Sequence, residues 1–399
     1  MSLSDVRADV FHKCALFAEQ QYQELMSSEE IKRLQVYRER KTQEIAERRQ
    51  EIQRASNKKQ AQELSGHQRK AEALFAQDTA QLNEFIGARD NYLRQAIEML
   101  SLCLQASDSF DVDAVIRLCS LWFANFKNDV SVVQGTINRV PSRKFVFLAH
   151  QLSARLSVAD APNANQNVLQ SLLLRMCSEH PFHSLYQVYS LQSSHSDSMS
   201  SRRRSSGVVL DGSQADRAEA AFSIFERLVG TPDSTSRARS VKQLCNAYLE
   251  WAKYPIKSDP VITERRSRRD KSDKLPIPKH MSILRVKDLR VPVTTANTPL
   301  DPTMRYDNCV WILGYQDTFE VAGGINLPKI CHCLGSDGVK YKQLVSSLRR
   351  KIRVHSLTVT QNSSKERGMM ISDKMLSWSK FLSCVIKSLI ATKILASGS

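Results

Sequence analysis

The sequence predicts a mainly α-helical protein, in which a helical solenoid is followed by a small antiparallel β-sheet. Over most of residues 1–254, apolar residues recur at intervals of three and four, which is the period of a helix. After about residue 285 the period changes, and short β-type runs alternate with turn residues. The chain has 399 residues, 42% of them hydrophobic, which is enough for two or three domains with sizeable cores.

The first hundred residues are predicted to contain a long antiparallel helix pair. Residues 29–64 are rich in Glu, Lys, Arg and Gln and have few apolar positions, a pattern typical of a solvated helix with opposite charges four residues apart. Residues 68–105 would form the return arm, because Leu82, Ile86 and Leu93 belong to an apolar stripe at helical spacing. The heptads are irregular, which favours such a pair over a coiled coil.

Shorter helices are predicted at residues 111–126, 142–158, 166–179, 182–191, 214–229 and 234–254. Helices of this length, joined by short turns, are typical of an α-solenoid. Residues 193–213 are rich in Ser, Arg and Gly and are predicted to be a disordered loop. This segment is either a plain solvated loop or a basic phosphorylation or localisation element.

A change of structure is predicted after residue 254. Residues 255–279 are rich in proline and charge and are predicted to be a linker. The β-type runs that follow cover residues 290–295, 309–314, 318–322 and 330–334. The sequence GSDG at residues 335–338 is a candidate hairpin turn.

The net charge of +16 is concentrated in two segments. Residues 261–290 contain ten Lys and Arg against four Asp and Glu, and residues 346–399 contain ten against two. The rest is nearly balanced, so no specific nucleic-acid site is evident. Nonspecific binding of the two basic segments to nucleic acid or acidic membrane is an alternative. Residues 378–390 are predicted to form a basic amphipathic helix.

The nine cysteines include no C-x-x-C pair. The densest group is Cys331, His332 and Cys333, but alternate strand residues face opposite sides, so His332 would point away from both sulfurs. We therefore predict buried free thiols, no metal site and a reducing compartment. No apolar run approaches the roughly 18 residues of a membrane span, and no signal peptide is visible.

Residues 319–338 (FEVAGGINLPKICHCLGSDG) are the most informative for function. Gly323 and Gly324 lack Cβ atoms and permit a close approach of backbone to a ligand. Pro328 fixes φ just before Lys329, and a lysine held there could point its charge at a phosphate. Because the spacing does not match a Walker A motif, the pattern alone favours an ordinary hairpin with a surface lysine.

Several motifs in this order resemble the phosphatidylinositol 3-kinase-related protein kinases of the ATM type. The motifs are IRLCSLWF (116–123), LAHQLSARL (148–156), EHPFHSLYQV (179–188), DRAEAAFSI (216–224), SVKQLCNAYLEWA (240–252), LPIPKH (275–280), KDLRVPVTT (287–295) and the segment 319–338. The resemblance implies a FAT-type helical solenoid followed by a small, incomplete kinase N-lobe. Residues 1–185 would be the C-terminal part of the FAT solenoid, 186–285 helices, loop and linker, 286–345 the partial N-lobe and 346–399 an unrelated basic tail.

The resemblance also implies an ATP site and a set of partners. Gly323 and Gly324 would belong to the phosphate-binding loop, Leu327 would lie where that loop covers the nucleotide, and Lys329 would contact the phosphates. Intact members use ATP and Mg²⁺ to phosphorylate Ser or Thr before Gln in protein substrates of the DNA damage response. A nuclear location is implied, with cytoplasm as an alternative, and homodimerisation is left open.

The resemblance stops after KQLV at residues 342–345. The family continues with KGRDDLRQD, whereas this chain continues with SSLRRKIRVHSLTVTQ. We find no G-D-R-H-x-x-N catalytic loop and no D-F-G or D-L-G metal motif in the 54 residues after Val345. Phosphoryl transfer needs Mg²⁺ held by Asp and Asn and a group that orients the nucleophile. We therefore predict no catalytic residue, no metal ligand and no catalysis in these 399 residues. The tail would be an alternative exon, a read-through or a gene-model error. The alternative function is a non-catalytic helical scaffold.

Overall fold

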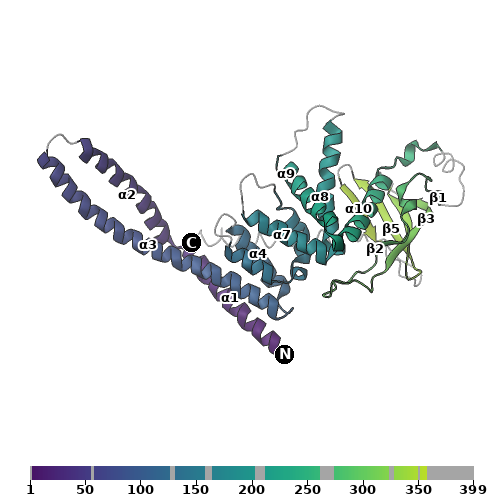
Figure 1. Cartoon of the computed structure of the whole chain (residues 1–399), viewed down its shortest axis with the longest axis horizontal. Helices are drawn as coiled ribbons and strands as arrows, with labels where there is room; N and C mark the ends of the chain where they lie inside the picture. Colours follow the sequence, from purple (N-terminus) through teal and green to yellow (C-terminus); the bar gives the residue numbers. More distant parts are fainter. Residues whose placement is uncertain are drawn as a thin grey trace, which may run out of the picture. The chain divides into compact units, whose positions relative to one another are not determined.

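The computed structural model describes residues 2–54, 58–125, 131–157, 164–202, 212–260, 274–322, 328–348 and 351–356. All of them fall within the unit Met1–Ser356. Helices come first and a small antiparallel sheet follows (Figure 1), which confirms the predicted fold class. The amphipathic helix predicted at residues 378–390 lies outside the described residues. None of the helices that the structure describes is long and apolar enough to cross a membrane.

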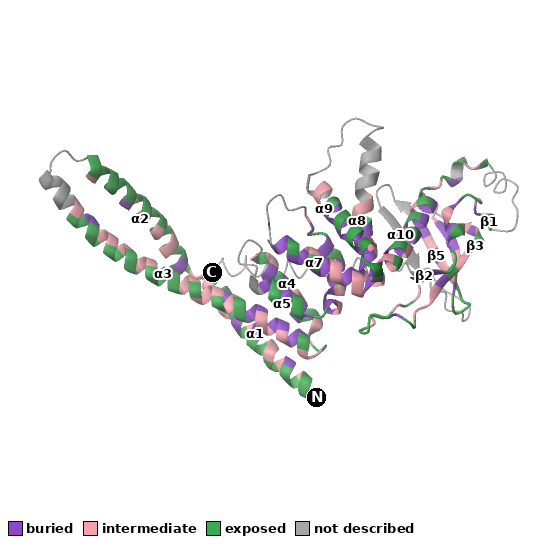
Figure 2. Ribbon diagram, viewed as in Figure 1, coloured by how far each residue is buried: buried purple, intermediate pink, exposed green. Residues whose placement is uncertain are grey.

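Three helices form the first part of the chain: α1 (Leu3–Ser27), α2 (Glu29–Arg54) and α3 (Lys58–Ala106). Both α1 and α2 pack along the 49-residue α3 (Figure 1), so the predicted helix pair is present. The pair is joined near residues 54–58, earlier than the predicted 64–68. Helix α1 buries small side chains such as Ala8 and Ala15, whereas α2 buries only Ile31 and Ile45 and is mostly exposed (Figure 2).

Further helices follow in the described residues up to residue 253. They are α4 (Asp111–Ala124), α5 (Ser131–Arg139), the 3₁₀ helix η1 (Ser142–Leu148), α6 (Ala149–Ser153), α7 (Ala164–Glu179), α8 (Pro181–Arg202), α9 (Gly212–Gly230) and α10 (Pro232–Lys253). The disordered loop predicted at 193–213 is wrong for residues 193–202, because α8 continues there. That stretch contains no Gly or Pro to stop a helix. Residues 203–211 lie outside the described part.

The single helix predicted at residues 142–158 is also wrong. Its first seven residues are the 3₁₀ helix η1, which places Lys144 in the interior, and only Ala149–Ser153 form an α-helix. The Lys144 ammonium contacts Asp108 and Asp111 and donates to the carbonyl oxygen of Ser107 at 3.1 Å. A tertiary ion-pair network therefore fixes this segment, which local periodicity does not reveal.

The sheet consists of β1 (Leu275–Pro276), β2 (Leu289–Pro292), β3 (Trp311–Val321), β4 (Lys329–Gly335), β5 (Lys340–Leu348) and β6 (Lys351–Ser356). The short 3₁₀ helix η2 (Ile256–Ser258) precedes it, and the 3₁₀ helix η3 (Ser282–Arg285) lies between β1 and β2. The strand order is β1-β3-β4-β5-β6, with β2 also paired to β3, and every pairing is antiparallel.

Three sequence expectations change here. The runs predicted at 309–314 and 318–322 are one strand, β3, whose register shifts within its length. Residues 275–276, assigned to the linker, are strand β1. The sheet also extends past residue 345, because β5 runs on to Leu348 and β6 pairs with it.

The predicted hairpin turn at residues 335–338 is confirmed. Gly338 has φ of 78°, which favours glycine, and its N–H donates to the Gly335 carbonyl at 2.9 Å. A Cβ on Gly335 would lie 2.7 Å from Val310 and 2.8 Å from Tyr341. Both glycines are therefore required by the turn itself.

Candidate functional site at the end of helix α10

Lys329, the first residue of β4, lies under the C-terminal end of α10. Its side chain is only 4% exposed. Its Nζ donates to the carbonyl oxygens of Trp251 at 2.6 Å and Ala252 at 3.0 Å, and it lies 5.1 Å from the centre of the Trp251 ring. The last carbonyls of a helix have no partner within the helix and carry the negative end of its dipole. The ammonium therefore satisfies groups that the helix leaves open.

The surroundings of this lysine are apolar and aromatic. The buried Trp251 ring meets Phe319 edge-on at 4.9 Å and stacks on Tyr254 at 5.8 Å. Burial lowers the pKa of Lys329 to about 8, which the neighbouring Cys331 partly opposes. Among the described residues no carboxylate pairs with this ammonium. The charge is thus stabilised by main-chain dipoles and a ring face.

The structure describes only part of the predicted ATP site. Gly323, Gly324 and Leu327 lie outside the described residues. On either side of them the ends are joined, because the N–H of Ala322 donates to the Pro328 carbonyl at 2.8 Å. The interpretation of Lys329 as a surface lysine is wrong, since the side chain is buried. Its contact with ATP phosphates stays a prediction.

A buried polar network joins α10 to the sheet beside this site. The hydroxyl of Tyr248 lies 3.1 Å from Thr294 Oγ1 and 2.7 Å from the Tyr315 hydroxyl, and it donates to Gln343 Oε1 at 2.8 Å. Tyr248 and Gln343 are both buried. Burial raises the pKa of Tyr248, so the hydroxyl stays protonated. Sequence reasoning missed this network, and no local motif announces it.

A histidine cluster ties the helices to the loop before β3. Tyr306 places its hydroxyl 2.8 Å from His180 Nδ1 and 3.3 Å from His183 Nδ1, and His183 Nε2 donates to the Thr298 carbonyl at 3.0 Å. Phe182 packs edge-on against Tyr306 at 5.3 Å. Burial lowers the pKa of His180 to about 4 and lowers that of His183 as well. Both rings are therefore neutral at pH 7.

The predicted alternation along β4 is confirmed. Cys331 and Cys333 are buried, and His332 between them is half-buried. Burial raises the pKa of both thiols to about 12, so they are protonated and unreactive at neutral pH. Among the described residues no three His, Cys, Asp or Glu side chains gather in a way that could hold a metal.

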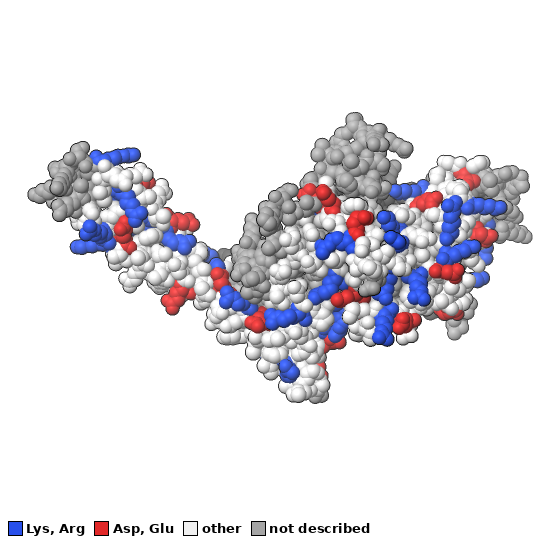
Figure 3. Space-filling view, viewed as in Figure 1, with Lys and Arg blue, Asp and Glu red and all other residues white. Residues whose placement is uncertain are grey.

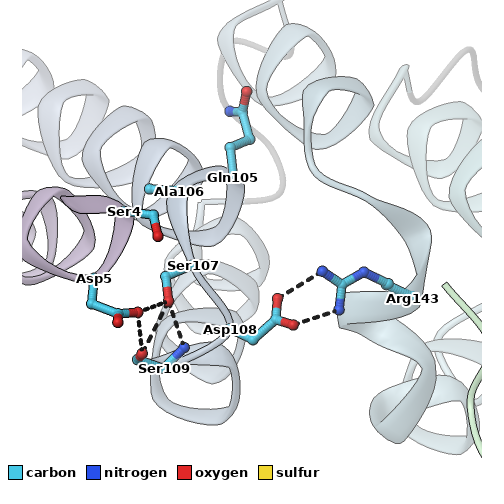
Figure 4. A pocket seen from close by; sticks show the side chains of 8 residues that line it. All are labelled: Ser4, Asp5, Gln105, Ala106, Ser107, Asp108, Ser109 and Arg143. Atoms are coloured by element: carbon cyan, nitrogen blue, oxygen red, sulfur yellow. Dashed lines mark hydrogen bonds and ion pairs between the residues drawn. The ribbon is translucent and has the colours of Figure 1, made fainter. Parts of the chain in front are cut away.

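A polar pocket lies far from the sheet, where α1 meets the α3–α4 corner and η1. Figure 4 shows that Asp108 faces Arg143, while Asp5 faces Ser107 and Ser109. Asp5 accepts hydrogen bonds from Ser107 at 2.6 Å and Ser109 at 3.0 Å, and such bonds hold its pKa well below the usual range. Arg143 pairs with both oxygens of Asp108. Because these polar groups form hydrogen bonds with one another, we assign the pocket a structural role in joining α1, the α3–α4 turn and η1.

The described surface carries mixed charge. Lys and Arg side chains alternate with Asp and Glu over the helices and the sheet in Figure 3. Much of the two basic segments falls at residues 261–273 and 346–399, whose side chains lie outside the described part. The structure therefore does not test their binding to polyanions.

Comparison with known proteins identifies the relatives of this arrangement. No family model matches the chain. It is 31% identical over 336 residues to the serine/threonine-protein kinase ATM of Arabidopsis thaliana, an alignment that covers 82% of this chain and 8% of the relative. It is 34% identical over 272 residues to the serine-protein kinase ATM of Sus scrofa, covering 64% of this chain and 8% of the relative.

Solved structures agree. The open conformation of CtTel1 superposes with a TM-score of 0.66 at 28% identity and covers 85% of this chain and 12% of that one. The FAT and kinase domain of CtTel1 gives 0.65 at 27% identity, covering 85% and 21%. The helical region and its antiparallel sheet thus share the fold of a part of the CtTel1 FAT and kinase domain structure. The chain is homologous to a segment of the ATM/Tel1 serine/threonine-protein kinases and spans about a tenth of their length.

Proposed function

We propose that this chain is the junction of an ATM/Tel1-type serine/threonine-protein kinase, in which the helical region holds the sheet of the kinase N-lobe. One observation carries the proposal: the turn between α7 and α8, together with α10, is bound to the sheet and its loops through three separate polar contacts, at His180, Tyr248 and Lys329. A scaffold needs such contacts to fix one domain against another. The longer relatives with which the chain aligns are named as serine/threonine kinases.

In the proposed function the N-lobe belongs to an enzyme of the DNA damage response in the nucleus. That enzyme would transfer phosphate from ATP to Ser or Thr before Gln. The loop with Gly323, Gly324 and Leu327 would cover the nucleotide, and bound Mg²⁺ would neutralise charge on its phosphates. The fit of Lys329 to a phosphate is poor in this arrangement, because main-chain carbonyls already hold its ammonium.

These 399 residues alone are expected not to transfer phosphate, because they contain neither the catalytic loop nor the metal motif. The purified chain is incubated with ATP, Mg²⁺ and a Ser-Gln peptide, with an active ATM/Tel1 kinase as the positive control. No product above background is expected. Turnover that rises with chain concentration would contradict this part of the proposal.

The junction role is tested with a chimaera. Residues 1–345 replace the aligned segment of CtTel1, and phosphorylation of a Ser-Gln peptide is measured against the parent. We expect the chimaera to retain activity, because the segment supplies the same helices and strands. A folded chimaera with no activity would overturn the proposal.

A second candidate is a non-catalytic scaffold that dimerises. The observation in its favour is the exposed surface of α2, which buries only Ile31 and Ile45. One solved relative is described as a complete CtTel1 dimer with C2 symmetry. Sedimentation equilibrium of the whole chain decides this, since a scaffold of this kind gives a concentration-dependent dimer that is lost when α2 and the start of α3 are removed.

A further inference from the structure

The ammonium of Lys329 has its hydrogen-bonding capacity directed at α10. A lysine ammonium carries three donors and accepts nothing. Two of them reach the carbonyl oxygens of Trp251 and Ala252 at 2.6 and 3.0 Å, and the face of the Trp251 ring lies 5.1 Å away. The positive charge of Lys329 is therefore bound to the end of α10.

The helix in turn depends on this contact. Helix α10 ends at Lys253, and the N–H of Tyr254 returns to the Trp251 carbonyl at a long 3.3 Å. The carbonyls of the last turn are buried with Trp251 and Ala252, which are 0% and 5% exposed. Buried carbonyls without a donor are costly. The Lys329 ammonium adds a shorter bond to the Trp251 carbonyl and donates to the Ala252 carbonyl as well.

We infer that Lys329 is a positioning residue whose ammonium fixes the C-terminal end of α10 to the first residue of β4, and that it is not a ligand of a nucleotide phosphate. The inference refers to the nucleotide site of the proposed function. The contact between Lys329 and α10 on which it rests can be tested by stability and amide exchange, without nucleotide and without catalysis.

The position of Lys329 explains why this residue affects both helix α10 and the end of the β3–β4 strand pair. Lys329 pairs with Val321 in the last register pair of β3 and β4, and the next residues remain bonded through the Ala322 N–H and the Pro328 carbonyl. Phe319 on β3 packs against Trp251 from the same side. A phosphate could recruit the ammonium only if the buried Ala252 carbonyl lost this donor and the Trp251 carbonyl kept only the long bond from the Tyr254 N–H. The strand ends are therefore held against the helix by the same charge.

The test compares Lys329→Met with Lys329→Arg and with the control Lys340→Met, whose lysine is exposed on β5. Without nucleotide, we expect Lys329→Met to lower the thermal midpoint by several degrees. Amide exchange should rise in residues 245–256 and at the start of β4 and stay unchanged in α4 and α7. Lys329→Arg should restore part of the loss, and the control should match the wild type.

An unchanged midpoint and unchanged exchange in Lys329→Met would overturn the inference. If that variant does not fold, the inference is tested on the wild-type chain by brief labelling of its lysines with acetic anhydride at pH 8. We expect Lys329 to react much more slowly than Lys340, and equal reactivity would contradict the anchor.

Nucleotide binding separates this inference from the proposed function. A fluorescent ATP analogue and a fluorescent adenosine are titrated into the wild type and Lys329→Arg. Equal changes in both affinities agree with a positioning role, whereas a selective loss of the triphosphate would show a phosphate ligand and overturn the inference. If the wild type binds neither probe, the proposed ATP site fails, and amide exchange still decides the anchor.

Discussion

Single buried hydroxyl and imidazole groups decide how the helices meet the sheet. Tyr248 bonds to Thr294, Tyr315 and Gln343, which come from three different parts of the β region. In the same way, the hydroxyl of Tyr306 lies within hydrogen-bonding distance of Nδ1 of both His180 and His183. Because these groups lie away from water, each needs its partner, and the loss of one leaves the others unsatisfied.

Replacing Tyr248 by Phe tests the first contact. The ring stays, but the buried Gln343 Oε1 atom loses the closer of its two donors and keeps the Tyr315 hydroxyl at 3.2 Å. We expect the free energy of unfolding to fall by about 1–3 kcal/mol, measured by urea denaturation. Tyr37→Phe is the matched control, since Tyr37 is 38% exposed on α2, and it should change little. Equal stability of the two variants would contradict the role of the network.

The histidine cluster predicts a dependence of stability on pH. Burial lowers the pKa of His180 from 6.5 to about 4. Between these values the unfolded chain binds more protons than the folded chain, so stability is present above pH 6.5 and is lost as the pH falls toward 4. The loss from this group is at most about 3 kcal/mol.

His180→Asn keeps a polar atom near Tyr306 but cannot titrate. We expect urea denaturation at pH 7 and pH 5 to show a smaller difference for this variant than for the wild type. His150→Asn, at an exposed position, should keep the full difference. An unchanged pH difference in His180→Asn would show that this ring does not carry the effect.

At the scale of the element, two helices have carbonyl groups at their C-terminal ends that accept hydrogen bonds from a cationic side chain of another element. At the end of α10, the carbonyls of Trp251 and Ala252 accept hydrogen bonds from Lys329 of β4. Helix α5 ends on Arg175 of α7, whose guanidinium donates to the carbonyls of Ile137, Asn138 and Val140 at 2.8–3.0 Å. Positive charge at a helix C-terminus is favourable, and here it also joins neighbouring elements.

Arg175→Met removes the cation from the end of α5 and keeps an unbranched apolar stem. We expect a loss of about 1–3 kcal/mol in the free energy of unfolding, because three main-chain carbonyls lose their donor. Arg239→Met, at an exposed position on α10, serves as the control. Calorimetric melts that coincide for wild type and Arg175→Met would refute this account.

At the scale of the whole molecule, the helices and the sheet share one hydrophobic core. The buried cluster runs from Ala8 of α1 to Val345 of β5 without a break. Trp251 and Ala252 of α10 belong to it together with Phe319 and Cys331 of the sheet. The sheet therefore depends on α10 to cover its apolar face.

This dependence predicts how fragments behave. Residues 274–356 alone should show no cooperative thermal transition by circular dichroism, because their apolar face is exposed. Residues 232–356, which add α10, should unfold more cooperatively. A sharp transition in the shorter fragment would mean that the sheet is stable without the helix.

The sequence predicted the features that short-range patterns encode. Helical periodicity located α4, α7, α9 and α10 to within a few residues, and GSDG located the turn. It failed where tertiary contacts override local preference, as at Lys144, and where no stop signal exists, as at residues 193–202. It also split β3 in two, because polar residues interrupt the apolar pattern of that strand.

By itself, the sequence determined the helical region, the switch to β-structure and the resemblance to ATM-type kinases, since these rest on composition, period and the order of motifs. Only the tertiary structure decided what Lys329 contacts. Its main partner, Trp251, is 78 residues away in the chain. A pattern of neighbours shows where a helix ends, but it does not show which distant charge satisfies its last carbonyls.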